Sequence, residues 1–377
     1  MAFYNVGSGD APFLKQLADA FTMSDNFHQP LMGGTGANHQ MLGLGDTPFW
    51  SDGRGNPLAP PAAIIANPDP LPDSNAYTVD GNWTNCSDAA QPGVGPIVAY
   101  LAALGLKANC VPDRFYMINN VVPAFLPNGA VRTTGIFAPP STIRTIGDAL
   151  NEKRVSFVYY GGGFNAAVRV ANGSTDPLDA IAAVYCQTCN FFQYASAIMS
   201  DAAQRKAHLK DITDFFDDLA AGTLPAVSFV KPDGFLDGHP ASSKLDLFEA
   251  VAKRILDRLG ARPELERDTA IFIVFDEGGG YYDSGYIQPL DFFGDGPRIP
   301  FLVVSRFARG GRVVHTYDDH VSILKFIERN WRLAPLTTRS RDNLPDPIPR
   351  PDNAYAPLNS PAIGDLFDMF DFTGIRP

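Results

Sequence analysis

No apolar run in this 377-residue sequence approaches the roughly 18–20 residues that a membrane-spanning helix requires. The first residues, MAFYNVGSGDAPFLKQLADAF, also lack the basic start and the unbroken apolar stretch of a secretory signal peptide. As written, the sequence therefore predicts a cytoplasmic protein without a transmembrane segment.

Basic residues are also fewer than acidic residues in this sequence. The chain has 30 Lys and Arg against 41 Asp and Glu, which gives a net charge of −11 at pH 7. Such a chain lacks a general attraction for a nucleic-acid backbone, so nucleic acid is not expected as a partner. An anionic ligand would need local help from a metal ion, an arginine or a helix N-terminus.

Cysteine occurs only four times, at Cys86, Cys110, Cys186 and Cys189. Two disulfides in an oxidising compartment or four free thiols in the cytosol would both fit this number. Cys186 and Cys189 form a single CxxC without a second one, which argues against a zinc ribbon. We expect structural disulfides, and the sequence leaves their pairing open.

The apolar content is that of a protein with a large core. Hydrophobic residues make up 45% of the chain, and 34 Gly and 32 Pro predict long ordered loops. We expect a single domain over residues 1–377, with a loop-rich insertion or cap at about 45–140. The Pro-rich tail, 334–377, is expected to wrap the surface. The oligomeric state stays open.

Strand and helix patterns are clearest after residue 140. A helix capped by Ser141 is expected to run to about Lys153 and to lead into a strand over 155–163. Three further apolar runs end in polar loops: LPAVSFVKPDGFLDGHP, TAIFIVFDEGGGYYD and RIPFLVVSRFARGG. Continuous apolar runs indicate strands buried on both faces, as in a parallel sheet, and helical patterns at 244–259 and 321–331 fit crossover connections.

Asp276 and Glu277 follow one of these buried runs directly. Functional groups of open α/β sheets gather beyond the carboxyl ends of the strands. Two hard carboxylates next to three glycines suit a metal ion near an anion. The alternative is an ordinary turn in which one acid caps the bend and the other faces solvent.

Three of the six histidines follow strand patterns in the same way, namely His239, His315 and His320. A single histidine is most often a surface or packing residue. Their repeated position, with Asp318 and Asp319 beside the last two, predicts a shared site for proton transfer or metal binding.

Thr35 lies between two glycines in PLMGGTGANH, ahead of a helical pattern. Glycine-rich turns can direct backbone N–H groups at an anion, and a hydroxyl held there can act as a nucleophile. The alternative is a plain turn in which Thr35 caps the helix.

Four segments occur in an order typical of one known family: SDNFHQPLMGGTGANH, VKPDGFLDGHPASS, FDEGGGYYD and RIPFLVVSRFARGGRVVHTYDDHVSILKFIE. On these segments the chain resembles the bacterial phosphoesterase family that includes phosphocholine-type phospholipases C and a respiratory-burst-inhibiting acid phosphatase, within the alkaline phosphatase superfamily. The resemblance covers nearly the whole chain. It implies an α/β fold, a three-layer α/β/α sandwich with a mostly parallel central sheet, and hydrolysis of phosphate esters.

The resemblance also implies roles for individual residues. Thr35 corresponds to the family's Ser/Thr nucleophile, which also contacts the metal. Asp276 and Glu277 correspond to acidic ligands of one or more divalent metal ions of unknown identity.

The motif histidines of the family contact phosphate or protonate the leaving group. His239, His315 and His320 match them, without an assignment of which does which. His28 and Asn38 match motif positions that we assign to substrate binding.

Two departures from the family pattern stand out. Relatives carry an upstream motif of the ENxSFD type that supplies further metal ligands, and no such motif occurs in this sequence. Many relatives have a histidine after the acid at position 283, where this chain has Ser284. Relatives are exported, so the resemblance implies a periplasmic or secreted location, against the cytoplasmic one predicted above.

Three functions therefore remain on the sequence alone. The first is a metal-dependent phosphoesterase with a phospho-threonine intermediate, whose substrate is a phospholipid or a soluble monoester. The second is a truncated non-catalytic remnant, or a protein of the same fold that binds a phosphate ligand. The third is a redox or metal-binding module built on Cys186 and Cys189.

Overall fold

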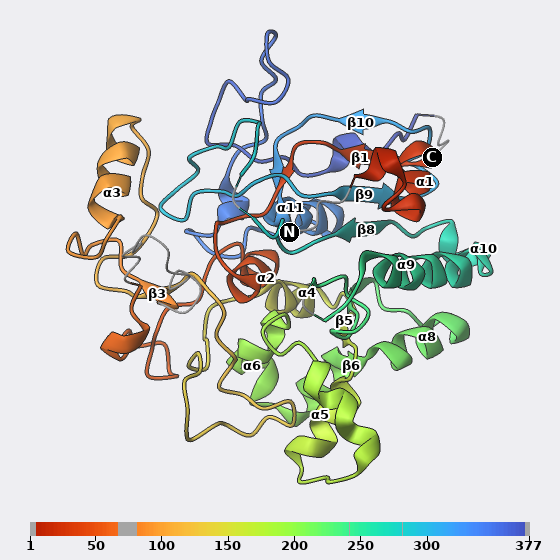
Figure 1. Cartoon of the computed structure of the whole chain (residues 1–377), viewed down its shortest axis with the longest axis horizontal. Helices are drawn as coiled ribbons and strands as arrows, with labels where there is room; N and C mark the ends of the chain where they lie inside the picture. Colours follow the sequence, from red (N-terminus) through yellow and green to blue (C-terminus); the bar gives the residue numbers. More distant parts are fainter. Residues whose placement is uncertain (1–4, 67–80, 241, 281, 374–377) are drawn as a thin grey trace.

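The computed structural model describes residues 5–66, 81–240, 242–280 and 282–373. Helices and strands alternate along most of this length (Figure 1). The strands are β1 (Thr22–Ser24), β2 (Phe27–His28), β3 (Trp83–Thr84), β4 (Tyr116–Met117), β5 (Phe157–Gly161), β6 (Leu209–Asp211), β7 (Val227–Lys231), β8 (Ile271–Val274), β9 (Phe301–Val304), β10 (Val313–Val314) and β11 (Asp318–Asp319). The helices are α1 (Pro12–Ala20), α2 (Thr35–Leu44), α3 (Val94–Ala103), α4 (Ile146–Lys153), α5 (Phe164–Ala171), α6 (Ser196–Met199), α7 (Ala202–His208), α8 (Ile212–Ala221), α9 (Leu245–Gly260), α10 (Pro263–Glu266) and α11 (His320–Trp331).

Two sheets form the centre of the molecule. The first has the order β6-β5-β7 and is parallel throughout, and the second has the order β10-β1-β9-β8. In the second sheet β1 and β10 are parallel, whereas β9 is antiparallel to both β1 and β8. The predicted α/β fold is confirmed. The parallel direction expected of β8 and β9 is wrong, because a continuous apolar run reports burial on both faces and not strand direction.

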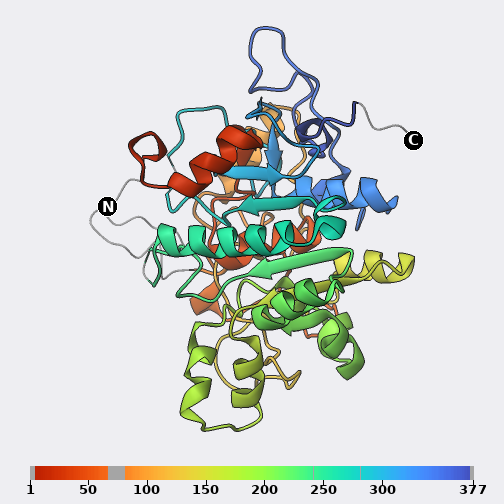
Figure 2. The ribbon, with the colours of Figure 1, turned by 90° about the vertical axis from the view of Figure 1, so that its right-hand side faces the viewer.

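Helices cover both faces of these sheets, which gives three layers (Figure 2). On one face Phe157 and Phe301 pack with the apolar sides of α2, α4 and α11. On the other face Tyr160 packs with α8 and α9, and Leu302 packs with α1 and α9. Side chains that alternate along each strand therefore enter two different cores, as the sequence pattern predicts.

Helix ends follow local chemistry. α4 begins at Ile146 and not near Ser141, because Thr145 and Asp148 form a reciprocal capping box there. The backbone N–H of Ser141 instead donates to the carbonyl oxygen of Tyr194, at 2.8 Å. The helix expected over 244–259 is observed as α9, and the one over 321–331 as α11.

The segment that carries β3, α3 and β4 lies at one end of the molecule, beside the layers (Figure 1). It has small cores of its own, one around Trp83 and one around Leu101. The tail contributes Ile363, Leu366 and Met369 to the main core. In the described part of the chain, no helix combines the length and apolar character needed to cross a bilayer.

Candidate active site

Thr35 is the first residue of α2 and faces the acidic loop after β8. Gly34 is the N-cap of α2, and no side chain caps the helix there, so Thr35 is not a capping residue. Its hydroxyl instead donates a hydrogen bond of 2.8 Å to Oε1 of Glu277. The structure thus joins two groups that lie 242 positions apart in the sequence.

Asp276 and Glu277 both reach this point because the chain bends directly after β8. The bend is fixed by the N–H of Gly278, which donates to Oε1 of Gln29 at 2.7 Å. Burial and the neighbouring charge of Asp276 raise the pKa of Glu277 to about 7. Burial opposes ionisation of Asp276 too, but His39, when protonated, and Lys231 outweigh it, so the pKa of Asp276 lies below its usual value.

His39 stands one helical turn after Thr35 and joins the same group. Its Nδ1 lies 2.9 Å from the carbonyl oxygen of Thr35 and 3.7 Å from Oδ2 of Asp276. Burial lowers the pKa of His39 to about 4, so the ring is neutral at neutral pH. No role for His39 was predicted from the sequence, although the spacing of four residues on a helix puts it on the face of Thr35.

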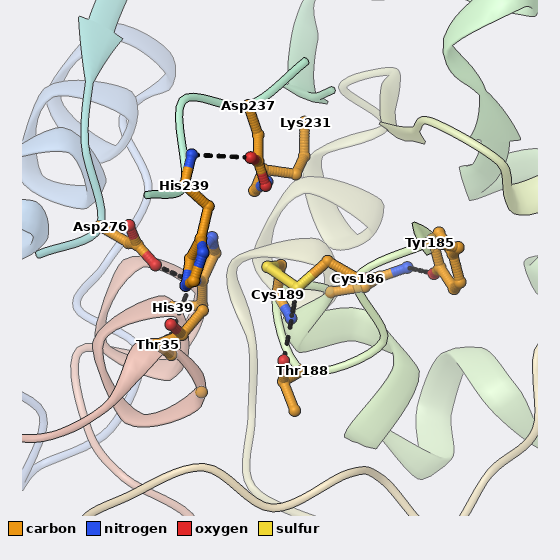
Figure 3. Close-up of a disulfide and its surroundings, with 12 residues drawn as sticks. Thr35, His39, Tyr185, Cys186, Thr188, Cys189, Lys231, Asp237, His239 and Asp276 are labelled. Carbon is orange, nitrogen blue, oxygen red and sulfur yellow. Dashed lines mark hydrogen bonds and ion pairs between the residues drawn. A yellow bond between two sulfur atoms is a disulfide. The ribbon is translucent and has the colours of Figure 1, made fainter. Parts of the chain in front are cut away.

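The loop after β7 brings a further histidine and a lysine (Figure 3). Lys231 Nζ lies 2.6 Å from Oδ2 of Asp237, while Oδ1 of the same carboxylate accepts the backbone N–H of His239 at 3.0 Å. In Figure 3 the ring of His239 points toward His39 and Asp276. His239 is exposed, so it stands at the rim of the site.

The glycine turn before Thr35 has a packing role. A Cβ on Gly33 would lie 2.1 Å from the carbonyl oxygen of Ile118, and one on Gly34 would lie 2.3 Å from Oδ1 of Asn119. The N–H of Gly36 donates to Oδ1 of Asn120 at 2.7 Å. The segment 118–120 therefore lies directly against the start of α2. It accepts the backbone N–H of Gly36, one of the donors of this glycine-rich turn that were expected to face an anion.

His320, the first residue of α11, contacts the backbone directly before Asp276 and Glu277. Its Nε2 is 3.0 Å from the carbonyl oxygen of Phe275 and its Nδ1 is 3.3 Å from that of Asn38. Burial lowers the pKa of His320. Asn38 is fully buried, and its Oδ1 accepts the N–H of Leu31 at 3.2 Å, so its side chain shapes the loop that leads to Thr35.

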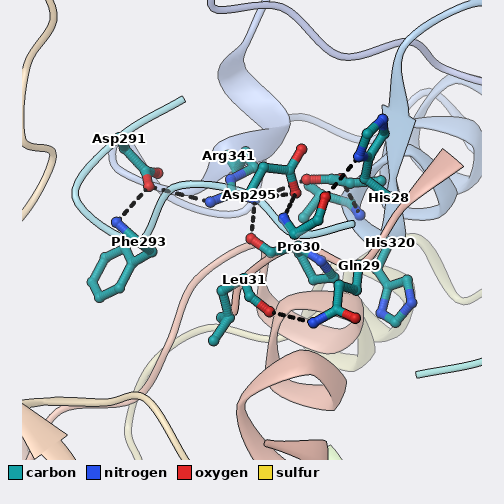
Figure 4. Close-up of polar contacts among 12 residues, drawn as sticks. His28, Gln29, Pro30, Leu31, Asp291, Phe293, Asp295, His320 and Arg341 are labelled. Carbon is teal, nitrogen blue, oxygen red and sulfur yellow. Dashed lines mark hydrogen bonds and ion pairs between the residues drawn. The ribbon is translucent and has the colours of Figure 1, made fainter. Parts of the chain in front are cut away.

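The buried side chain of Arg341 joins the start of α11 to the loop before Thr35 (Figure 4). Nη1 of Arg341 donates to Oδ2 of Asp319 at 2.9 Å and to the carbonyl oxygen of Pro30 at 2.7 Å. Nη2 donates to Oδ1 of Asp291 at 3.2 Å. Because Asp319 is the N-cap of α11, this network connects the start of α11, where His320 lies, with the loop before Thr35.

His28 and His315 belong to a different polar group. The ring nitrogens of His28 lie 2.7 Å from the carbonyl oxygen of Gly296 and 3.1 Å from Oδ1 of Asn26. Burial lowers the pKa of His28 to about 4. Nδ1 of His315 lies 2.7 Å from Oδ1 of Asp25. No described contact joins either ring to Thr35, so the site residues predicted from the sequence divide into two groups.

The oxygens of Thr35, Asp276 and Glu277 form the part of the site that suits a metal ion. Two carboxylates and a hydroxyl are donors that a hard divalent cation prefers, and a cation would relieve the repulsion that raises the pKa of Glu277. Over the described residues, no group of three or more His, Cys, Asp or Glu side chains is arranged to hold a metal. The donor chemistry fits a divalent cation, with these three residues as part of its ligand set.

All four cysteines are paired, as Cys86–Cys110 and Cys186–Cys189. The prediction of two disulfides is confirmed. The first connects the two ends of the segment that contains α3, and the second closes a tight loop near the site (Figure 3).

The sequence matches a known protein family over most of its length. The Phosphoesterase family matches residues 1–334. The hemolytic phospholipase C of Pseudomonas aeruginosa is 26% identical over 197 residues, which are 46% of this chain and 24% of the relative. Phospholipase C B of Mycobacterium tuberculosis is 30% identical over 177 residues, 39% of this chain and 33% of the relative. A phosphate-repressible acid phosphatase of Penicillium chrysogenum is 26% identical over 199 residues, 52% of this chain and 44% of the relative.

These matches cover well under half of each phospholipase C, so the chain is compared with only part of those proteins. The family match, in contrast, extends over most of the sequence and includes Thr35, His239 and the Asp276-Glu277 pair. Because it covers far more than half of the chain, this protein belongs to the Phosphoesterase family.

Proposed function

We propose that this chain hydrolyses phosphate esters by way of a phospho-threonine at position 35. The observation that carries the proposal is the 2.8 Å hydrogen bond from the Thr35 hydroxyl to Glu277. A threonine hydroxyl is a weak nucleophile, and a carboxylate within hydrogen-bond reach both orients it and can accept its proton.

Two displacements would complete the reaction. Oγ1 of Thr35 forms a bond to phosphorus while its proton passes to Glu277, and the bond from phosphorus to the ester oxygen breaks. The departing alcohol takes up a proton, for which His239 at the rim is the candidate donor. Water then attacks the phosphorus of the phospho-threonine and gives a proton back to His239. The bond from phosphorus to Oγ1 of Thr35 breaks, Oγ1 takes back the proton held by Glu277, and phosphate is released.

A divalent cation would be held by Asp276, Glu277 and Thr35 and would supply charge stabilisation for the phosphoryl oxygens. Two hydrogen bonds fix the parts of the chain that would hold the cation. His39 donates to the carbonyl oxygen of Thr35 and so fixes the first turn of α2, while the bond from Gly278 to Gln29 fixes the acidic loop. The proposed substrate class includes phospholipids and soluble monoesters, in line with the names of the relatives.

The nucleophile is tested by substitution. Thr35→Ala should lower kcat on p-nitrophenyl phosphate by about 10³-fold or more, whereas Thr35→Ser should keep measurable activity because it retains a hydroxyl. An acid-quenched reaction of the parent should show one added phosphoryl group by intact mass, located on Thr35 by peptide mapping. Thr134→Ala, at an exposed position, is the matched control and should behave as the parent.

Full activity of Thr35→Ala would overturn the assignment of the nucleophile. Phosphate binding without turnover by the parent would instead favour a binding protein of this fold. Metal analysis and a chelator series test the proposed cation independently of the nucleophile. Asp276→Asn should lose bound metal, whereas Thr134→Ala should not.

A further inference from the structure

Lys231 occupies a position that a surface ion pair does not explain. It is the last residue of β7, and its side chain is only 21% exposed, with 12% for that of its partner Asp237. The pair of Lys253 with Asp257, in contrast, joins side chains one helical turn apart that are both more than half exposed. The pair at Lys231 instead spans the loop from β7 to His239.

Two contacts hold the ammonium group of Lys231 and leave one of its donors for a ligand. An ammonium group has three hydrogen-bond donors. Oδ2 of Asp237, at 2.6 Å, and the carbonyl oxygen of Pro232, at 3.3 Å, use two of them, and the described residues offer no third acceptor. The charge of Lys231 lowers the pKa of both Asp276 and His39. Figure 3 shows Lys231 and Asp237 with the loop that brings His239 toward these two side chains.

A phosphoryl group would gain from such a positive charge in addition to the proposed divalent cation. Its oxygens carry one or two negative charges, and they would approach two carboxylates in a chain with a net charge of −11. His39 and His320 have lowered pKa values and supply no charge at neutral pH. Lys231 is the permanent positive charge that acts on Asp276 among the described residues.

We propose that Lys231 binds a non-bridging oxygen of the substrate's phosphoryl group, and that Asp237 is the residue that positions its ammonium group. This inference rests on the proposed function and adds that the site prefers a phosphoryl group with two negative charges to one with a single negative charge. A dianionic monoester gains more from Lys231 than a phosphodiester with a single negative charge. Asp237 links the ammonium group of Lys231 to His239, because its other carboxylate oxygen accepts the backbone N–H of His239.

The test compares Lys231→Gln and Lys231→Arg with Lys253→Gln as the matched control, at about pH 8, where a monoester is dianionic. Lys231→Gln should raise the inhibition constant of inorganic phosphate and lower kcat/KM for p-nitrophenyl phosphate, each by about 10- to 100-fold. The loss with p-nitrophenyl phosphorylcholine should be several-fold smaller. Lys231→Arg should recover part of the activity, and Lys253→Gln should match the parent.

Asp237→Asn separates positioning from folding. The amide oxygen can still accept the N–H of His239, but the amide nitrogen cannot accept from Lys231. This variant should weaken phosphate inhibition while the thermal unfolding midpoint stays near that of the parent. Unchanged phosphate inhibition in folded Lys231→Gln, or equal losses on both substrates, would overturn the inference while Thr35 remained the nucleophile. Activity that survives Thr35→Ala would overturn the proposed function, and titration of phosphate against Lys231→Gln would still decide the role of the lysine.

Discussion

Glu328 is a carboxyl group whose surroundings disfavour its charge. It lies in α11 with a relative exposure of 6%, and its Oε1 has no hydrogen-bond partner among the described residues. Burial, together with the hydrogen bond and charge of Asp342, raises the pKa of Glu328 to about 10. Asp342 is fixed in turn, because its Oδ2 accepts the N–H of Leu336 at 2.7 Å.

The direction of the pH effect follows from this raised pKa. The folded chain binds the proton of Glu328 more tightly than the unfolded chain, so its stabilising effect is full below pH 4.5 and is lost as the pH rises toward 10. Glu328→Gln keeps the shape without the charge. It should raise the free energy of unfolding by about 1–2 kcal/mol at about pH 8 and change it little at about pH 4.5.

Urea unfolding at the two pH values measures this difference. Glu266→Gln, at a half-exposed position on α10, is the control and should be neutral at both. A Glu328→Gln variant that is less stable than the parent at pH 8 would mean that the folded chain carries this glutamate ionised.

Residues of the site differed in how far the sequence could predict them. Thr35, Asp276, Glu277 and His239 stand in strong local patterns, and the structure brings them together. His39 and Lys231 were missed because nothing local marks them, since a histidine inside a helix and a lysine at a strand end are common. Only the fold, which brings the start of α2 to the loop after β8, gives His39 its contacts with the site and suggests the role proposed for Lys231.

At the scale of elements, the start of α2 depends on close approach by the segment 118–120. Gly33→Ala would place a Cβ 2.1 Å from the backbone oxygen of Ile118, and a backbone atom cannot move aside as a flexible side chain can. The substitution should displace Thr35 from Glu277, lower kcat by at least about 10-fold and destabilise the fold by roughly 1–3 kcal/mol.

Gly260→Ala offers the comparison, because a Cβ at the end of α9 would meet nothing within 4 Å. It should keep both the activity and the unfolding midpoint of the parent. If Gly33→Ala were equally silent, then contact with 118–120 would not set the position of α2.

Elements were predicted well where the pattern was local and poorly where it was not. The strand runs and the helices α9 and α11 follow from apolar periodicity. The antiparallel direction of β9 did not, because burial on both faces is the same for either direction. The start of α4 was placed too early because Thr145 and Asp148 form a stronger cap than Ser141.

At the scale of the whole molecule, the chain's last segment is part of the support of the site. Arg341 lies beyond the part of the chain that the family match covers, yet its side chain is 1% exposed and contacts Asp291 and Asp319. Composition predicted only a Pro-rich tail here. The partners of Arg341 come from distant parts of the sequence, so no local pattern could have revealed them.

Removal of Arg341 should therefore cost more than the loss of an ion pair on the surface. Arg341→Leu leaves the buried carboxylates of Asp291 and Asp319 without their cation, and this should lower the free energy of unfolding by roughly 3–5 kcal/mol. Arg267→Leu removes an arginine paired with Asp268 at exposures above 60%, and should cost about 1 kcal/mol or less. Adding Asp291→Asn to Arg341→Leu should restore part of the loss, because one buried charge is then gone. Chemical unfolding of the four proteins measures these differences, and an Arg341→Leu protein as stable as Arg267→Leu would show that the tail does not anchor the loop before Thr35.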